Sequence, residues 1–165
     1  MPALPEPELP LDPDLEVDTT PAGTPRPVHL RPAFLGIVFV GGVFGTAARE
    51  GLMLVVPTVA GIPWAIFLAN LLGAFLLGVL LEALARRGGD HGVRRTLRLL
   101  LGTGFMGGFT TYSALATDAA LLFGEQSPGT GIAYGLGTVV FGVAATTFGI
   151  TVGSFVRRRH AGVAL

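Results

Sequence analysis

The sequence predicts an all-α integral membrane protein with four transmembrane helices, the third of which is broken at mid-membrane. Half of the residues are hydrophobic and only 13% are charged. Four runs carry no charge at all, and these are residues 33–48, 62–81, 99–117 and 127–156. Their length is near the roughly 20 residues that a helix needs to cross a bilayer. The alternative is a soluble helical protein, but almost no residues are left to form its wetted face.

Prolines and glycines mark the expected helix boundaries. Proline is favoured in the first turn of a helix and disfavours helical backbone in the residue before it. The predicted helices run from Pro32 to just before Pro57, from about Pro63 to Arg86, from about Val93 to Phe123 with a break at Gly107-Gly108, and from about Ile132 to Val156. A Gly/Pro turn at 124–131 is expected to precede the last helix.

The flanking regions differ from the spans. Residues 1–32 hold nine of the twelve prolines and six of the eleven acidic residues. We expect this N-terminal tail to be disordered, because it buries too little apolar surface to order itself. It lacks the basic start and apolar core of a signal peptide. Residues 33–157 are expected to form the four-helix transmembrane domain, followed by a short basic C-terminal tail at 158–165.

Arginines predict the orientation, since the chain contains no lysine. Ten of the eleven arginines fall before the first span, around the second loop or after the last span. In a four-span topology these regions share one side of the membrane. The positive-inside rule therefore places both termini and the second loop in the cytoplasm. The other side keeps only Arg49.

Residues 104–113 are the most informative stretch, because Gly-Phe-Met-Gly-Gly-Phe-Thr-Thr-Tyr-Ser interrupts an apolar run. Paired glycines followed by hydroxyl residues break a helix where no water is available. In a bilayer, irregular backbone is tolerated only where it is buried in protein, lines a cavity or binds an ion. The stretch therefore predicts an ion site.

Other patterns are weaker. Asn70 is the only amide side chain within the second span, and it serves either as a functional donor or in a hydrogen bond that packs helices together. Arg49 and Glu50 are expected to form an ion pair at the membrane interface. Gly-x-x-x-Gly spacings such as Gly41/Gly45 and Gly104/Gly108 favour close helix packing. Four spans enclose a hydrated path poorly, so we expect an oligomer with its path near subunit contacts. The Gly-x-Gly-x-x-Gly pattern at 102–107 lies inside a span, without the strand that a dinucleotide site requires.

Four segments, taken together, resemble the CrcB/Fluc fluoride channels. They are Gly-Gly-Val-Phe-Gly-Thr-Ala-Ala-Arg at 41–49, the asparagine-glycine segment at 68–78, the broken segment at 104–113, and Tyr134 with Thr138. The resemblance covers residues 34–156. It identifies the chain as a member of this family, in which subunits form antiparallel dimers with two narrow pores.

The resemblance also implies roles for individual residues. Gly107 and Thr110 would offer main-chain carbonyls to a structural Na⁺ at the dimer centre. Asn70 would donate its amide to the permeating fluoride, and Thr111, Ser113 and Thr138 would offer hydroxyls along the path. Arg49 would attract anions into the vestibule. The family usually places phenylalanines where this chain has Tyr112 and Leu115, so the aromatic part of the ion pathway departs from the pattern.

These observations predict a fluoride-selective passive anion channel, or a subunit of one, that lowers the cytoplasmic fluoride concentration. We expect it to lie in the bacterial inner membrane. The alternatives are a proton-coupled small multidrug-type exporter and a non-conducting structural partner subunit. The exporter class needs a carboxylate embedded in its first helix, and Glu50 lies too near the helix end. The arginine bias favours a dimer with an oppositely oriented paralogue. We expect no enzymatic activity and no nucleic-acid partner.

Overall fold

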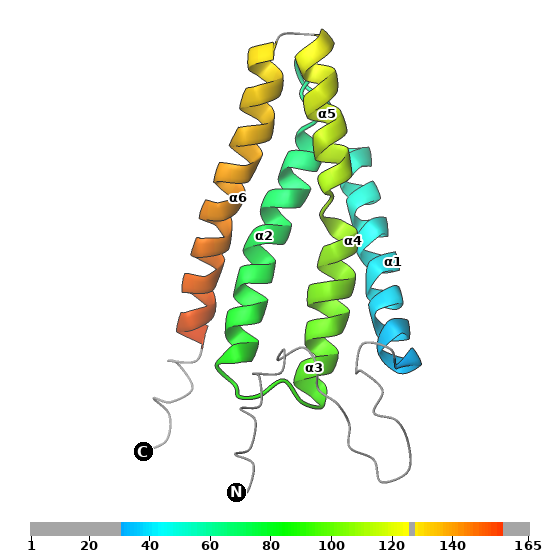
Figure 1. The fold of residues 1–165 in the computed structure, drawn as a ribbon, viewed down its shortest axis with the longest axis vertical. Helices are drawn as coiled ribbons and strands as arrows, with labels where there is room; N and C mark the ends of the chain where they lie inside the picture. The colour runs from blue at the N-terminus through cyan, green and yellow to red at the C-terminus, as the bar shows by residue number, and fades with distance from the viewer. Residues whose placement is uncertain (1–30, 126–127, 157–165) are drawn as a thin grey trace, which may run out of the picture. The chain divides into compact units, whose positions relative to one another are not determined.

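The computed structural model describes residues 31–125 and 128–156, and the regular elements within these ranges are all helical. They are α1 (Pro32–Val55), α2 (Trp64–Ala85), α3 (Val93–Leu97), the π-helical segment η2 (Arg98–Met106), α4 (Gly107–Phe109), α5 (Tyr112–Glu125) and α6 (Pro128–Val156) (Figure 1). Three helices, α1, α2 and α6, are long and apolar enough to cross a membrane. The predicted tails lie outside the described residues, apart from positions 31 and 32.

The first two helices end where the sequence predicts. Helix α1 begins at Pro32 and ends two residues before Pro57, and α2 begins directly after Pro63. The connection turns sharply at Ala60 and Gly61, which both have positive φ, at 53° and 76°. The Pro63 carbonyl accepts the backbone N–H of Ile66 at 3.2 Å, so it serves the first turn of α2.

The third helical segment is broken, but not at the predicted residues. Gly107 has helical dihedral angles of −63° and −34°, and the paired glycines belong to α4. The backbone becomes extended at Thr110, where φ is −83° and ψ is 156°. Figure 1 shows this interruption between α4 and α5. The prediction of a break at Gly107-Gly108 was therefore wrong by two to three residues, because glycine permits a break without requiring one.

Helix α6 begins four residues earlier than predicted. It starts at Pro128 and includes Gly129 and Gly131, which we assigned to a turn. Proline at the first helical position costs no hydrogen bond, which explains the early start. Gly131 packs against α5, since a methyl group there would lie 2.7 Å from the Phe123 nitrogen. Glycine at position 131 therefore permits the close approach of α6 to α5.

Glycines bring α1 into backbone contact with the broken segment, as the Gly-x-x-x-Gly spacing predicted. A methyl group on Gly104 would lie 2.7 Å from the Val38 carbonyl oxygen and 2.9 Å from the Gly41 Cα. Methyl groups on Gly45 and Gly108 would overlap the carbonyl oxygens of Phe105 and Gly42, respectively. The two glycine pairs therefore pack against each other, which holds η2 and α4 against α1.

Helix α2 packs along α6 in the same manner (Figure 1). A methyl group on Gly78 would lie 2.6 Å from the Thr146 carbonyl oxygen. The rings of Phe75 and Phe148 stack at this contact, with centroids 5.6 Å apart. The buried apolar core is small and lies between α2, α5 and α6, comprising Ile66, Leu115, Leu122 and Tyr134.

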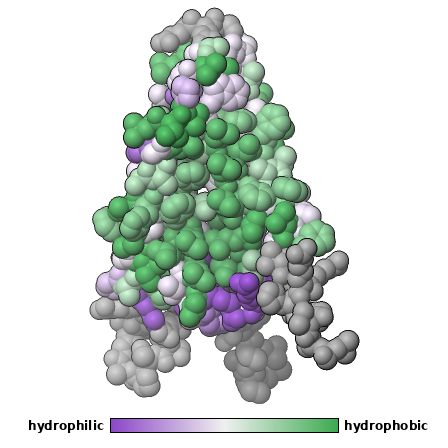
Figure 2. Space-filling view, turned by 180° about the vertical axis from the view of Figure 1, so that it is seen from behind, coloured by the Kyte–Doolittle hydropathy of each residue, from purple (hydrophilic) through white to green (hydrophobic). Residues whose placement is uncertain are grey.

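The surface is mainly apolar. Figure 2 shows hydrophobic residues over most of one face, with hydrophilic residues gathered toward one end. The loop between α2 and α3 carries such residues. Arg98 of η2 contacts Asp90 of this loop at 2.6 Å, and Arg94 of α3 donates to the Gly89 carbonyl at 2.8 Å. Large apolar side chains such as Phe39, Leu54 and Val140 are more than 60% exposed. A surface of this kind fits a multi-pass membrane protein.

The glycine contacts generate a prediction about stability. Replacing Gly45 by alanine should destabilise the protein by about 1–3 kcal/mol, because the methyl group overlaps the Phe105 carbonyl. Gly51 is the matched control on the same helix, since no atom lies within 4 Å of a methyl group there. Gly51→Ala should be neutral or stabilising by up to about 1 kcal/mol. Unfolding midpoints in detergent measure both effects, and equal losses would contradict this packing.

Candidate ion site at the helix break

The break is held by one side chain of α2. The Asn70 Nδ2 donates to the Thr111 carbonyl at 3.1 Å, and the Thr111 backbone N–H donates to Asn70 Oδ1 at 2.8 Å. The two bonds fix which amide atom is nitrogen, because a flipped side chain would oppose two donors and two acceptors. Asn70 thus supplies a hydrogen-bond donor and an acceptor to the backbone groups of Thr111, which have no partners within a helix.

At the C-terminal end of α4, before the break, the hydrogen bonds are made by Thr110. The Thr110 backbone N–H and the Thr110 hydroxyl both donate to the Met106 carbonyl, each at 2.9 Å. Beyond the break, Thr111 Oγ1 accepts the backbone N–H of Ala114 at 3.2 Å. That contact caps the N-terminus of α5. The break is therefore an ordered arrangement with defined hydrogen-bond partners on both sides.

The carbonyls of Gly107 and Thr110 are among those that lose their helical donors at the break. In a continuous α-helix, the Thr111 N–H would donate to the Gly107 carbonyl and the Ala114 N–H to the Thr110 carbonyl. Here these donors go instead to Asn70 Oδ1 and Thr111 Oγ1. Gly107 and Thr110 are the residues predicted to ligate a cation. Their carbonyls are hard oxygen donors, so the donor set fits a hard monovalent cation.

A groove of about 370 Å³ adjoins the break and brings together most of the predicted pathway. Its lining includes Asn70, Thr110, Thr111, Tyr112, Leu115 and Thr138. Ser113 is not part of the lining, but its hydroxyl lies 3.2 Å from that of Thr111. Gly107 and Arg49 also lie outside it, and Arg49 pairs with Glu50 at 3.3 Å near the end of α1.

The hydroxyls near the groove differ in whether their hydrogen is available to bond an anion. Thr138 is 4% exposed and its hydroxyl donates to the Tyr134 carbonyl at 2.7 Å. Its hydrogen must leave that bond before it can serve an anion. The Thr111 and Ser113 hydroxyls contact each other, and one hydrogen suffices for that contact. The other hydrogen of the pair is therefore available for a further acceptor.

Comparisons with known proteins identify the family. The family described as CrcB-like protein, Camphor Resistance (CrcB), matches residues 36–150. The chain belongs to the CrcB family. A Leifsonia xyli subsp. xyli protein named fluoride-specific ion channel FluC 2 is 50% identical over 134 residues, which are 81% of this chain and 92% of that protein. Cutibacterium acnes FluC 1 is 47% identical over 113 residues, 68% of this chain and 79% of that protein.

A third relative is more distant. The fluoride-specific ion channel FluC of Phenylobacterium zucineum is 42% identical over 116 residues, which cover 69% of this chain and 90% of that protein. The matched family region begins within α1 and ends within α6, so it contains the break and the groove. The resemblance to the CrcB family seen in the sequence is therefore confirmed.

The two positions where this CrcB chain departs from the expected aromatic pair have opposite surroundings. Tyr112 is 82% exposed at the start of α5, although it also borders the groove. Leu115 is 8% exposed and packs in the core with Ile66, Leu122 and Tyr134. Leucine at this position thus fills core volume as well as lining the groove.

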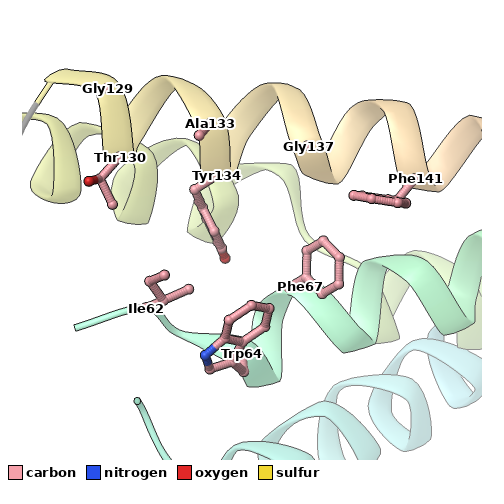
Figure 3. Close-up of a pocket in the computed structure, with 9 residues that line it drawn as sticks. All are labelled: Ile62, Trp64, Phe67, Gly129, Thr130, Ala133, Tyr134, Gly137 and Phe141. Atoms are coloured by element: carbon pink, nitrogen blue, oxygen red, sulfur yellow. The ribbon is translucent and has the colours of Figure 1, made fainter. Parts of the chain in front are cut away.

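The fourth-helix residues that carry the CrcB resemblance face different cavities. Thr138 lines the groove, whereas Tyr134 lines a larger apolar pocket of about 510 Å³ beside Trp64, Phe67 and Phe141. Figure 3 shows these aromatic side chains around that pocket, with the Tyr134 hydroxyl pointing toward the start of α2. There it donates to the Pro63 carbonyl at 3.4 Å. Tyr134 therefore ties α6 to α2.

Sequence reasoning missed three contributors. Asp118 follows the charge-free run 99–117 directly, and its Oδ2 is buried without a hydrogen-bond partner among the described residues. Thr46 was not singled out, but its hydroxyl lies 3.5 Å from the Gly108 carbonyl. Gly73 permits the approach of α2, since a methyl group there would overlap the Thr110 side chain. Thr46 and Gly73 lie inside the segments 41–49 and 68–78 that carry the family resemblance, which was the available signal.

The cap at the break generates a second prediction. Thr111→Val should destabilise the protein by about 1 kcal/mol, because the valine cannot accept the Ala114 N–H. Thr111→Ser should restore most of the loss. Thr147→Val is the control, since the exposed Thr147 hydroxyl bonds only its own helix, at the Val143 carbonyl, and should change stability by at most ~0.5 kcal/mol. Unfolding midpoints in detergent compare the three, and a serine variant as unstable as valine would argue against a cap.

Proposed function

We propose that this chain forms a fluoride-selective passive anion channel, or one subunit of it, that lowers cytoplasmic fluoride. The main support for this proposal is the ordered helix break beside the groove, in a chain whose CrcB relatives are named fluoride-specific ion channels. Fluoride is small and strongly hydrated, so it enters a narrow path only where protein donors replace its water. The groove supplies such donors while most of its lining is apolar.

Asn70 is the proposed central donor of the anion path. One of its two amide hydrogens bonds the Thr111 carbonyl, which leaves the second for an ion in the groove. Thr111 and Ser113 add the spare hydrogen of their hydroxyl pair, and Thr138 adds its own once it leaves the Tyr134 carbonyl. Tyr112 borders the same groove, and the positive edge of its ring would favour an anion.

Arg49 is the proposed vestibule residue. Its side chain is 20% exposed, and it attracts anions through its charge rather than by direct contact with the groove. The adjacent Glu50 carboxylate offsets part of that charge at 3.3 Å. The vestibule contribution of Arg49 is therefore smaller than that of an unpaired arginine.

A structural sodium ion at the dimer centre completes the proposal. The carbonyls of Gly107 and Thr110 would hold it, and two subunits would together supply four oxygens. The diverted N–H groups of Thr111 and Ala114 support this assignment. A methyl group on Gly107 would meet no atom within 4 Å, so this side of α4 is open for a second subunit.

The proposed channel has four spans and two subunits in the bacterial inner membrane. The broken segment from η2 through α5 is the fourth crossing, added to the three continuous helices. The small core and the exposure of Tyr112 support a partner that covers the break. The antiparallel arrangement follows from the family resemblance, and both termini would lie in the cytoplasm.

Fluoride efflux from liposomes tests the channel proposal directly. The chain reconstituted in the assembly that conducts should release fluoride without a proton gradient and retain chloride. Asn70→Asp should abolish this release, because a carboxylate repels the anion and lacks the amide hydrogens. Undiminished efflux from the mutant would leave Asn70 outside the path. A pH-driven flux would instead favour a proton-coupled exporter.

The identity of the partner generates a fourth prediction. Ten of eleven arginines lie on one predicted side, which should fix one orientation, so an antiparallel dimer then needs an oppositely biased paralogue. Topology reporters fused to the C-terminus should report only the cytoplasm, and efflux should require co-expression of the paralogue. Equal signal from both sides, with efflux from the chain alone, would show an antiparallel homodimer instead.

A further inference from the structure

Asn70 accepts a hydrogen bond from the peptide group between Thr110 and Thr111, whose carbonyl is one of the proposed cation ligands. The N–H of Thr111 and the C=O of Thr110 belong to the same peptide unit, which is planar and trans. The hydrogen bond from this N–H to Asn70 Oδ1, at 2.8 Å, therefore sets the direction of the Thr110 carbonyl. The C=O of a trans peptide points opposite to its N–H, so the Thr110 carbonyl points away from Asn70 Oδ1.

The same hydrogen bond also governs the Gly107 carbonyl. In an unbroken helix, the Thr111 N–H would be the donor to Gly107. Because Asn70 takes this donor, the Gly107 carbonyl is released from the helix ladder. A single acceptor atom on α2 thus aims one proposed cation ligand and frees the other.

Glycine does not account for the break by itself. Gly107 remains helical, and Gly108 is held against α1 by contact with Gly42 and Thr46. The extended residue is Thr110, which lies against Gly73, one turn beyond Asn70 on α2. The absent side chain of Gly73 therefore lets α2 approach closely enough for Asn70 to reach the Thr111 peptide.

We infer that Asn70 is a positioning residue for the cation site, in addition to any contact with the anion. This inference rests on the proposed function, because it takes the sodium site at Gly107 and Thr110 as given. One side chain then serves both ions: Oδ1 prepares the cation ligands, and the second Nδ2 hydrogen faces the groove. Occupancy of the cation site would in turn hold the Thr111 peptide against Asn70 and fix the anion donor.

Substitutions at position 70 separate the two roles. Asn70→Asp keeps an oxygen that accepts the Thr111 N–H but loses the amide hydrogens, so it should retain the cation site and lose the anion path. Asn70→Leu has similar volume and loses both functions. Thr138→Val changes the groove at a residue that does not touch the break, and should leave the cation site intact.

The readout is the rise in thermal unfolding midpoint with sodium, measured on the purified conducting assembly against N-methylglucamine at equal ionic strength. An ion that binds only the folded state raises the midpoint, and the rise grows with the logarithm of the ion concentration relative to its Kd. Wild type, Asn70→Asp and Thr138→Val should respond alike, whereas Asn70→Leu should need about tenfold more sodium or show no response. If Asn70→Leu fails to fold, Asn70→Ala takes its place with the same expectation.

Two results would overturn the inference: a wild-type sodium response in the leucine and alanine variants, or a response lost in Asn70→Asp as fully as in Asn70→Leu. Neither result bears on fluoride efflux by the wild type, which tests the proposed function separately. A wild type that conducts fluoride but shows no sodium response would remove the cation site and this inference together, while the channel proposal stands.

Discussion

The pairing of the Asn70 side chain with the Thr111 peptide is the contact on which the break depends. A peptide group outside a helix needs partners, and an apolar bilayer supplies none. Asn70 meets this need with one donor and one acceptor, at 3.1 Å and 2.8 Å. An aspartate or leucine of similar size satisfies at most half of it, which explains why an amide stands at this point of an otherwise apolar helix.

The glycines determine where that pairing can occur. Gly73 allows α2 to approach Thr110, while Gly104 and Gly108 bring the broken segment onto the backbone of α1. The segment is thus held from two sides, by an amide on α2 and by close backbone contact with α1. Because these contacts involve main-chain atoms, they position carbonyl groups more rigidly than contacts between flexible side chains would.

The groove beside the break lies at the surface of the chain. Tyr112 is 82% exposed there, and Gly107 faces open space. A path for a dehydrated ion needs walls on all sides, so the proposed channel requires a second subunit to close it.

The sequence by itself determined the helical membrane class, the ends of the first two helices and the family, because charge-free runs, prolines and a distinctive hydroxyl-glycine motif are local features. It also named most residues that line the groove. Tertiary structure alone decided that the break falls at Thr110 rather than at the glycines, that Leu115 lies in the core and that Asn70 bonds the backbone. These outcomes depend on which atoms of α2 and α1 reach the third segment, and hydrogen-bond partners 41 residues apart leave no periodic signal in the chain.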